Sequence, residues 1–358
     1  MESLAPGTTL GGFRVVRVLG RGGMGVVYEA VQEPLERRVA VKELPAEFAR
    51  SKELAERFRR EGLAYAQLEH QAIVSVHDLV EKGDALYLIT EYVDGADLSK
   101  LLEKGGALPP DCVAIVGARL AEALDYVHFH KLLHRDVKPA NVMLSRTGEV
   151  KLMDFGIAKD QTEKDLTRDG VLVGSPAFLA PELLKGERPD VRSDLWALGV
   201  TLYQLVVGEK PFVGKGPDEL QAAIRKGRFV PVRERASHVP RRLALAIERC
   251  LEKRPRARWP SAGALAHELQ TIEAKLAPRL HPQARLTALM AHRGFATEEE
   301  ALTCVDAESL VATKAVDEEA ALMARLRPRP WRWALGLLFA LGAAGAAAAK
   351  WSLFWHLK

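Results

Sequence analysis

The sequence predicts an α+β fold in two unequal parts, a small β-rich part with one helix followed by a larger, mainly helical part. Between residues 10 and 92, short runs rich in Val, Ile and Tyr alternate with glycine and charged turns, a pattern typical of strands. From residue 97 to residue 272, apolar residues recur at helical spacing instead. The 358 residues, 48% of them hydrophobic, suffice for a large core.

Within the first part, the Gly cluster and the charged stretches separate the expected elements. One helix is expected between Pro45 and His70, where AEFARSKELAERFRREGLAYAQLEH has helical periodicity. Strands are expected over residues 15–19, 26–30, 37–44, 73–80 and 85–93.

The second part carries three long amphipathic or apolar runs without an internal repeat. They predict helices over residues 111–130, 193–208 and 261–276. The following segment, residues 273–330, is polar and rich in Ala and Glu, and it ends in a Pro-Arg stretch. Its sequence fits either a small helical module or a flexible tether.

Composition narrows the functional classes. The net charge is +4, from 51 basic and 47 acidic residues, an excess too small to predict nucleic acid as a partner. The three cysteines are scattered without a Cys-x-x-Cys pair, which argues against a disulfide framework or a thiolate metal site. The first ten residues lack a charged and an apolar run, so no signal peptide is expected.

A glycine cluster stands in LGRGGMGVV between the first two expected strands. Its spacing is G-x-G-x-x-G, from Gly20 through Gly22 to Gly25, but a strand follows it rather than a helix, which argues against a dinucleotide-binding fingerprint. Glycines between strands let backbone amides approach phosphate oxygens closely. A simple glycine-rich hairpin remains the alternative.

Lys42 lies in VAVK, among residues expected to face a core. A lysine in such a strand needs an anionic partner. The candidates are Glu61 on the long helix and the phosphates of ATP, whereas a lone lysine at a strand end is commonly just solvated.

The stretch LLHRDVKPANVML places five polar side chains between apolar ends: His134, Arg135, Asp136, Lys138 and Asn141. Such a loop is either a solvated turn or a catalytic constellation held by its hydrophobic flanks.

Two further motifs follow this loop. Asp154, in KLMDFG, offers the kind of hard oxygen ligand that Mg²⁺ prefers, as does the amide of Asn141, although an aspartate opening a turn is the simpler interpretation. Ala180, Pro181 and Glu182 form an APE sequence.

The ordered set GRGGMGVV, VAVK, a helical Glu61, HRDVKPAN, DFG and APE resembles the protein kinase family, in particular the Hanks-type serine/threonine kinases of bacteria. The resemblance covers residues 10–272. It implies a bilobal kinase fold, with an N-lobe over residues 10–92 and a C-lobe over residues 97–272. It also implies ATP and two Mg²⁺ ions, replaceable by Mn²⁺, as cofactors, and transfer of the γ-phosphate to Ser and Thr hydroxyls of proteins.

For the catalytic loop, the resemblance implies that Asp136 orients or accepts the proton of the substrate hydroxyl and that Asn141 holds a second Mg²⁺. Lys138 would neutralise the γ-phosphate, and a lysine here resembles serine/threonine rather than tyrosine kinases. His134 is expected to pack and hydrogen-bond rather than act as a base. Arg135 resembles the arginine that pairs with a phosphorylated activation loop.

The nucleotide would contact both lobes. Asp154 would chelate Mg²⁺, Lys42 would hold the α- and β-phosphates, and Glu61 would position Lys42. Thr90 resembles the gatekeeper before the hinge residues Glu91, Tyr92 and Val93, and Asp97 would reach the ribose or cap the next helix. The expected nucleotide-binding residues are Leu19, Gly20, Arg21, Gly22, Gly23, Met24, Gly25, Val27, Ala40, Lys42, Glu91, Val93 and Met143.

The activation segment offers Thr162, Thr167 and Ser175 as hydroxyls for regulation. Thr167 is the first candidate for a regulatory phosphate, because such a group would pair with Arg135. An unmodified polar loop is the alternative. Trans-autophosphorylation would call for a homodimer. Glu182 resembles a residue that forms a structural ion pair with a later arginine, for which Arg258 is the candidate.

Other polar residues have simpler interpretations. His128, His130 and His134 straddle a helix end and a loop without a converging carboxylate at zinc-like spacing, so metal binding by them is not expected. Asp194, near the start of an expected helix, is interpreted as its cap.

The C-terminal run predicts a single transmembrane helix over residues 331–355. Trp333 to Ala349 is uncharged and, as a helix, about 25 Å long, which is the short edge of the spanning range. Tryptophans bracket the run, and arginines precede it, so the kinase part would face the cytoplasm at the cell (inner) membrane. A buried or peripheral Ala-rich helix is the alternative.

Two other activities remain open. A pseudokinase would bind nucleotide or partners without transfer, but the five residues that transfer needs are all present: Lys42, Glu61, Asp136, Asn141 and Asp154. A lipid or small-molecule kinase is disfavoured by Lys138 and by the APE sequence.

Overall fold

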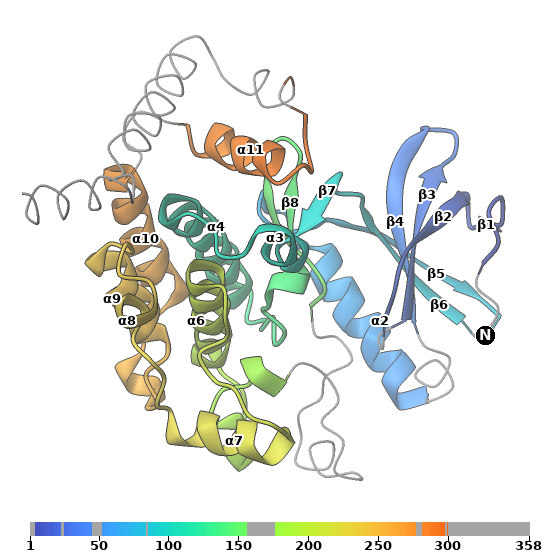
Figure 1. Ribbon diagram of the computed structural model, residues 1–358. Coiled ribbons are helices and arrows are strands. Elements are labelled where there is room, and N and C mark those ends of the chain that lie inside the picture. The colour runs from blue at the N-terminus through green and yellow to red at the C-terminus, as the bar shows by residue number, and fades with distance from the viewer. Residues whose placement is uncertain are drawn as a thin grey trace, which may run out of the picture. The chain divides into compact units, whose positions relative to one another are not determined.

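The computed structural model describes residues 4–22, 25–44, 52–83, 85–155, 176–276, 281–297 and 299. Contacts divide the chain into the units Met1–Cys304 and Val305–Lys358, and all described residues belong to the first. Within this unit, one strand-rich part with a single helix adjoins a part built mainly of helices, as Figure 1 shows. These are the two lobes of the bilobal fold that the sequence predicts.

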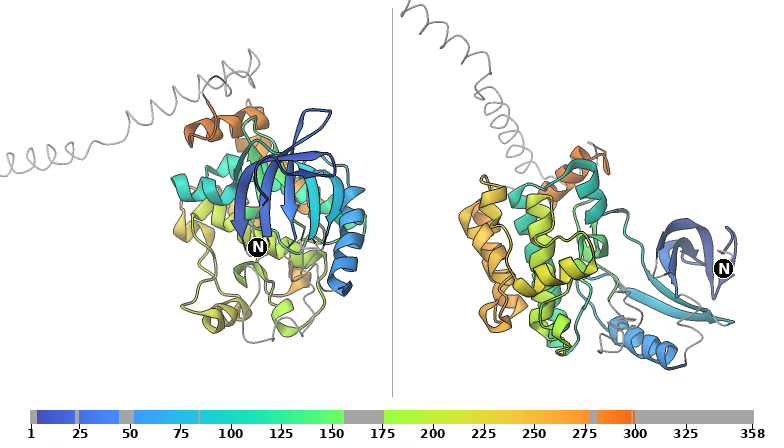
Figure 2. Two further views of the ribbon diagram at one scale, coloured as in Figure 1. Left: turned by 90° about the vertical axis from the view of Figure 1, so that its right-hand side faces the viewer. Right: turned by 60° about the horizontal axis from the view of Figure 1, so that its bottom comes forward.

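The N-lobe is a six-stranded antiparallel sheet with the strand order β1-β2-β3-β4-β6-β5. Helix α2 (Lys52–Ala66) packs against β5, and Figure 2 shows it beside that edge of the sheet. The strands are β1 (Thr9–Leu10), β2 (Phe13–Gly22), β3 (Gly25–Gln32), β4 (Arg37–Glu43), β5 (Val76–Lys82) and β6 (Ala85–Glu91).

The two faces of this sheet differ. One face is a closed apolar core, which includes Tyr28, Val39 and Val41, each fully buried. On the other face, four side chains are only partly buried: Val27, Ala40, Lys42 and Thr90. There Val27 lies opposite Lys42, and Ala40 lies opposite Thr90. Because Ala40 and Lys42 are two residues apart on β4, all four side chains share this second face. The candidate nucleotide-binding residues Val27, Ala40 and Lys42 therefore lie together on one face of the sheet and keep part of their surface exposed.

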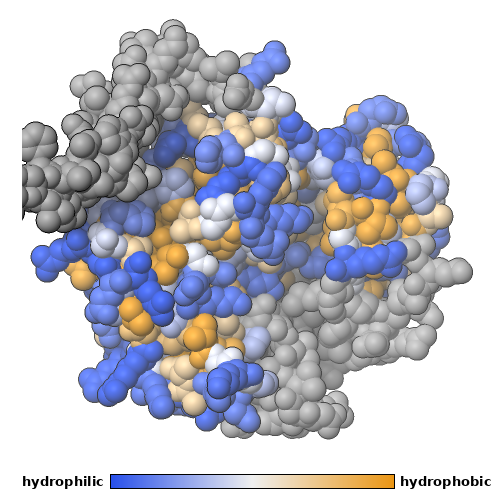
Figure 3. Space-filling model, in the orientation of Figure 1, coloured by the Kyte–Doolittle hydropathy of each residue, from blue (hydrophilic) through white to orange (hydrophobic). Residues whose placement is uncertain are grey.

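The C-lobe packs its helices around α4, which is apolar on nearly all sides and buried accordingly. Helices α6 and α10 contact α4, and the strands β7-β8-β9 form a small sheet beside it. On the face drawn in Figure 3, hydrophilic side chains predominate, with apolar side chains showing between them. The elements are β7 (Gly95–Asp97), α3 (Leu98–Gly105), α4 (Pro110–Phe129), η1 (Pro139–Asn141), β8 (Val142–Ser145), β9 (Val150–Leu152), η2 (Pro176–Phe178), η3 (Leu183–Lys185), α6 (Val191–Val207), α7 (Pro217–Lys226), α8 (Val232–Arg235), α9 (Arg241–Cys250), η4 (Pro255–Ala257), α10 (Ala262–Leu276) and α11 (Pro282–His292).

Two helices depart from their predicted boundaries, and one segment takes a structure that the sequence left open. Helix α2 is shorter than expected within the described residues. Helix α6 begins at Val191, two residues before the predicted start, because Asp190 and Ser193 form a capping box there. Helix α10 ends at Leu276 as predicted, and in the segment after it, whose structure the sequence left open, residues 282–292 form α11, which packs on α4 and β8.

The expected transmembrane run, residues 331–355, lies outside the described residues. Among the helices that are described, none combines the length and the apolar character needed to cross a membrane.

Candidate active site

The loop before β8 gathers its charges around one carboxylate. Asp136 accepts a bond of 2.8 Å from Lys138 Nζ at Oδ2, and Asn141 Nδ2 donates to both Oδ2 and the backbone oxygen of Asp136, each at 2.8 Å. Pro139 opens the short η1 turn that brings Asn141 back toward Asp136. The three residues that the sequence predicts as catalytic therefore lie in one cluster.

A second carboxylate, Asp194 of α6, holds the start of this loop. It accepts the backbone N–H groups of His134 (2.9 Å) and Arg135 (2.8 Å) and pairs with His128 Nε2 at 2.8 Å. Burial alone would raise the pKa of Asp194, but the His128 bond and charge and the loop N–H groups outweigh it and leave this pKa below its usual value. The interpretation of Asp194 as a helix cap is wrong, since Asp190 caps α6.

Those bonds hold a strained backbone in place. Arg135 has a φ of 64° and Asp154 a φ of 57°, in the left-handed region that residues other than glycine seldom adopt. Such a conformation persists only where neighbouring contacts over-determine it, and at Arg135 the bond from its N–H to Asp194 is one of them. The strain coincides with two residues of the predicted site.

His134 is a buried packing residue. Its Nδ1 accepts the N–H of Asp136 at 3.2 Å, which makes Nε2 the donor to Met153 O, also at 3.2 Å. Full burial is the main cause that lowers the pKa of His134, so the ring is neutral near pH 7. A neutral ring with both nitrogens engaged fits the packing role expected from the sequence.

Lys42 reaches across from the N-lobe to Asp154, with Nζ 2.7 Å from Oδ1. Both side chains keep part of their surface exposed, 21% for Lys42 and 31% for Asp154. Glu61, the expected partner of Lys42, lies on α2, but its side chain is outside the described residues. The pair brings together two residues separated by 112 positions.

Aromatic contacts connect α2 with the loop that carries Asp136. Phe155 stacks on Tyr65 of α2 at 4.1 Å between ring centroids and lies 4.6 Å from the His134 ring. The Tyr65 hydroxyl donates to Leu133 O at 3.1 Å. The position of α2 is thereby coupled to the loop that carries Asp136.

The end of β6 is held by an ion pair between Glu91 and Lys151 that the sequence did not suggest. Lys151 Nζ lies 2.8 Å from Glu91 Oε1, and Ser75 N–H donates to Glu91 Oε2 at 3.2 Å. The side chain of Glu91 is thus engaged with Lys151 and Ser75, and its backbone N–H donates to Ser75 O at 2.8 Å. Asp97 caps α3 by accepting Lys100 N–H at 3.1 Å.

Oxygen ligands for divalent metal stand at the same place. The amide nitrogen of Asn141 is used by Asp136, so the group with which Asn141 can bind a metal is its oxygen. Asp154 adds a carboxylate. One amide and one carboxylate, completed by phosphate oxygens and water, fit the way Mg²⁺ is bound beside nucleotides. The donor set therefore fits Mg²⁺ with ATP.

The three histidines point to different partners. His128 bonds Asp194, His130 Nδ1 contacts Tyr126 O at 2.9 Å, and His134 bonds Met153 O. Within the described residues, no group of three or more His, Cys, Asp or Glu side chains is arranged to hold a metal.

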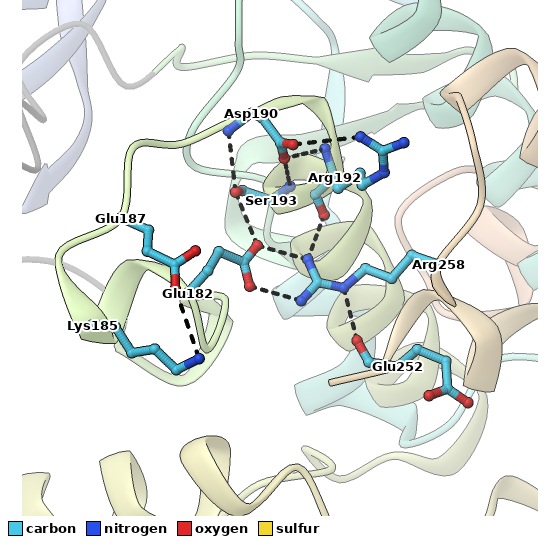
Figure 4. A network of polar contacts seen from close by, with 8 residues as sticks. All are labelled: Glu182, Lys185, Glu187, Asp190, Arg192, Ser193, Glu252 and Arg258. Atoms are coloured by element: carbon cyan, nitrogen blue, oxygen red, sulfur yellow. Dashed lines mark hydrogen bonds and ion pairs between the residues drawn. The ribbon is translucent and has the colours of Figure 1, made fainter. Parts of the chain in front are cut away.

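Glu182 and Arg258 form a buried ion pair, and Figure 4 shows its polar contacts. Arg258 Nη1 and Nη2 lie 2.7 and 2.8 Å from the two oxygens of Glu182, and Arg258 Nε donates to Glu252 O at 2.9 Å.

Five predicted site residues lie outside the described part of the chain: Gly23, Met24, Thr162, Thr167 and Ser175.

Comparison with known proteins identifies the family to which this chain belongs. The family model described as "Protein kinase domain" matches residues 13–270. This chain belongs to the protein kinase family. It is 36% identical over 288 residues to serine/threonine-protein kinase PknB of Mycolicibacterium smegmatis, an alignment that covers 78% of this chain and 46% of the relative.

Solved kinase structures share the fold. The kinase domain of Mycobacterium tuberculosis PknI is 33% identical with a TM-score of 0.61, and the match covers 75% of this chain and 99% of that one. Rad53 in complex with AMP-PNP is 25% identical with a TM-score of 0.62, over 72% of this chain and 64% of that one. The chain spans less than half the length of the first curated relatives it matches.

Proposed function

We propose that this chain is a serine/threonine protein kinase that transfers the γ-phosphate of ATP to Ser and Thr hydroxyls of proteins. The observation that carries the proposal is the Asp136 carboxylate, held by Lys138 and Asn141 in the C-lobe, together with the Lys42–Asp154 pair that joins the two lobes. The names of the curated relatives support the acceptor class, and the lysine at position 138 agrees with it.

The chain's residues have separate tasks in this reaction. Phosphoryl transfer needs little covalent help, so positioning and charge neutralisation supply most of the rate. Asp136 would orient the acceptor hydroxyl and take its proton. Lys138 would turn from Asp136 to the γ-phosphate, and Lys42 would meet the α- and β-phosphates. Bound Mg²⁺, held by Asn141 and Asp154, would neutralise the phosphate oxygens.

The test is phosphate transfer by the full chain in detergent. Wild type and Asp136→Asn receive Mg²⁺, γ-labelled ATP and a generic basic protein, with small-molecule acceptors in parallel. We expect label on protein Ser and Thr with wild type and a loss of at least about 1,000-fold with Asp136→Asn, because the general base and the orienting group are removed together. ATP binding by the variant serves as the control for folding.

Other outcomes separate the alternatives. Label on small molecules but not on protein would assign a small-molecule kinase. ATP binding by wild type without transfer to any acceptor would assign a pseudokinase.

We propose activation by trans-autophosphorylation between two copies, with Thr167 as the first acceptor and Thr162 and Ser175 as the next. A phosphate on Thr167 would find the Arg135 guanidinium as a partner. Mixing tagged Asp136→Asn protein with untagged wild type tests this: label on the tagged, inactive copy supports transfer in trans, and phosphosite mapping then ranks the three hydroxyls. An unlabelled tagged copy would contradict it.

We also propose that residues 331–355 tether the kinase to the inner membrane with its catalytic part in the cytoplasm. The support is the uncharged Trp-flanked run after an arginine-rich stretch. Full-length protein should stay in the membrane pellet after alkaline extraction, and a chain ending at residue 330 should not. Release of both by alkali would contradict the tether.

A further inference from the structure

Helix α11 and the turn after it pack against the C-lobe through buried apolar side chains, an ion pair and hydrogen bonds. This segment, residues 281–297, is called the strap below. It follows the residues that match the kinase family, 13–270, yet Leu286, Leu289 and Met290 are buried to 4% exposure or less. Figure 1 shows α11 lying across the end of α4 and beside β8. The strap is therefore packed like part of the lobe.

Polar contacts fix the strap at both ends. At its start, Arg285 forms an ion pair with Asp111 in the first turn of α4. At its end, Arg293 Nη2 donates to Ala107 O at 2.8 Å and Nη1 to Leu101 O at 3.4 Å. The guanidinium of Arg293 therefore lies at the C-terminal end of α3, where a positive charge complements the helix dipole.

Two glycines make room for the strap. A Cβ at Gly105 of α3 would lie 1.4 Å from Arg293 Nη1, and a Cβ at Gly148 would lie 2.2 Å from Gln283 O. Gly148 has a φ of +82°, which favours glycine for its own reasons, whereas Gly105 has an ordinary helical backbone. The glycine at position 105 is therefore explained by the Arg293 side chain and not by its own conformation.

The elements that the strap touches border the active site. Helix α3 packs against the η1 turn, which carries Asn141, and β8 carries Met143, the expected floor under adenine. The Asp97 cap begins α3 directly after β7. A shift of α3 or β8 would accordingly move the C-lobe side of the nucleotide site.

We propose that the strap positions the C-lobe side of the nucleotide site, with Arg293 as the positioning residue that holds α3. The inference rests on the proposed function for its nucleotide, ATP. The strap's contacts with α3 and β8 then favour the nucleotide-bound arrangement, and loss of Arg293 weakens ATP binding without removing any group that touches the phosphates.

The experiment compares full-length wild type with Arg293→Ala, Gly105→Ala, the double variant and His292→Ala. His292 is the matched control, an exposed neighbour on the same helix end. The dissociation constant for ATP with Mg²⁺ is measured by calorimetry, Tm by thermal unfolding, and KM for ATP and kcat by transfer assay.

We expect Arg293→Ala to raise the dissociation constant and KM for ATP about fivefold while kcat stays within about twofold of wild type. Gly105→Ala should do the same and lower Tm, because the new methyl group displaces Arg293. In the Arg293→Ala background, Gly105→Ala should raise Tm instead, since alanine is the better helix former. His292→Ala should match wild type.

Each contrary result is decisive. An equal change of Tm by Gly105→Ala in both backgrounds would mean that Arg293 does not hold α3. A lower Tm with unchanged ATP binding would make the strap a stabilising element only and overturn the positioning role. ATP binding without transfer in wild type would overturn the proposed function alone, since the binding constants still decide on the strap. Absence of ATP binding in wild type would overturn both.

Discussion

Two charged clusters of the C-lobe are built in opposite ways. Around Asp136, the partners Lys138 and Asn141 come from within five residues along the chain, and the nearby Lys42–Asp154 pair keeps part of its surface exposed. In the Glu182–Arg258 pair the partners lie 76 residues apart, and the side chains are 6% and 0% exposed. All three guanidinium nitrogens of Arg258 are bonded, two to Glu182 and one to Glu252 O.

The difference teaches which charges can change partners. A partly exposed pair such as Lys42–Asp154 can give up its contact when a phosphate arrives, because water and neighbouring groups replace part of the lost interaction. In the buried pair every guanidinium nitrogen is engaged by the protein, and losing either member leaves a buried charge alone. The first cluster is suited to chemistry and the second to holding the chain.

The largest expected effect on stability comes from a substitution in the buried Glu182–Arg258 pair. Arg258→Leu should lower the free energy of unfolding by about 3–5 kcal/mol, because the Glu182 carboxylate stays buried without its partner. Urea denaturation measures the change. The double variant with Glu182→Leu should lose less than the single variant, and a double variant that loses more would contradict this account of the pair.

The next effect concerns the exchangeable cluster. Lys138→Met should lower kcat about 100-fold, equivalent to roughly 2.7 kcal/mol of transition-state stabilisation, while Tm shifts by less than about 2 °C. The reason is that Asn141 still holds Asp136 after the lysine is gone. Transfer kinetics and thermal unfolding of the same preparation check both parts, and a large loss of Tm would show that this charge also holds the fold.

A smaller effect depends on pH. His134 is buried and its pKa is lowered, so between its folded-state pKa and the unfolded value of 6.5 the unfolded chain binds more protons. Stability should therefore be full above about pH 6.5 and fall by about 1.4 kcal/mol per pH unit below it. Asp194, with a lowered pKa, stays ionised throughout this window.

His70 and His77 also have pKa values lowered mainly by burial, and they act in the same direction. The comparison of wild type with His134→Asn by denaturation at pH 7.5 and 5.5 isolates the buried ring. The variant should show the shallower dependence, and identical slopes would exclude His134 as the cause.

The smallest effect is a control from the neighbourhood of the buried pair. Lys185 and Glu187 form an exposed pair at 3.7 Å, drawn beside Glu182 in Figure 4. Lys185→Ala should leave Tm unchanged within error, because an exposed pair gains little over its hydrated ions. A loss comparable with that of Arg258→Leu would show that proximity to Glu182, rather than burial, sets the effect.

Short-range features of this molecule follow from the sequence. The resemblance of HRDVKPAN to the loop of protein kinases implied that Asp136, Lys138 and Asn141 act together, and these three residues do lie in one cluster. The apolar runs likewise predict α4 and α10 within a few residues of their ends. Asp190 was missed as a cap although the pattern Asp190-x-x-Ser193 before an apolar run signals one.

Long-range choices are harder, because they depend on how the elements pack. The sequence offered Asp194 as a cap, and only packing of α6 against α4 brings it to His128 and the loop. Nothing in the local pattern around Lys151 points to Glu91, 60 residues earlier. The structure of the strap was also not predicted, because a helix this short is stable only when α4 and β8 supply a surface for it to pack on.

The strap also sets the order in which the chain is completed during synthesis. Its polar contacts join residues 174 to 192 positions apart, for example Arg293 with Ala107. At about 5–20 residues per second, the α3–α4 region leaves the ribosome roughly 10–40 s before Arg293 does. During that interval the face of α4 that α11 later covers is open to water and to chaperones. The nascent chain therefore passes through a stage in which α3 and β8 lack the contacts of the strap.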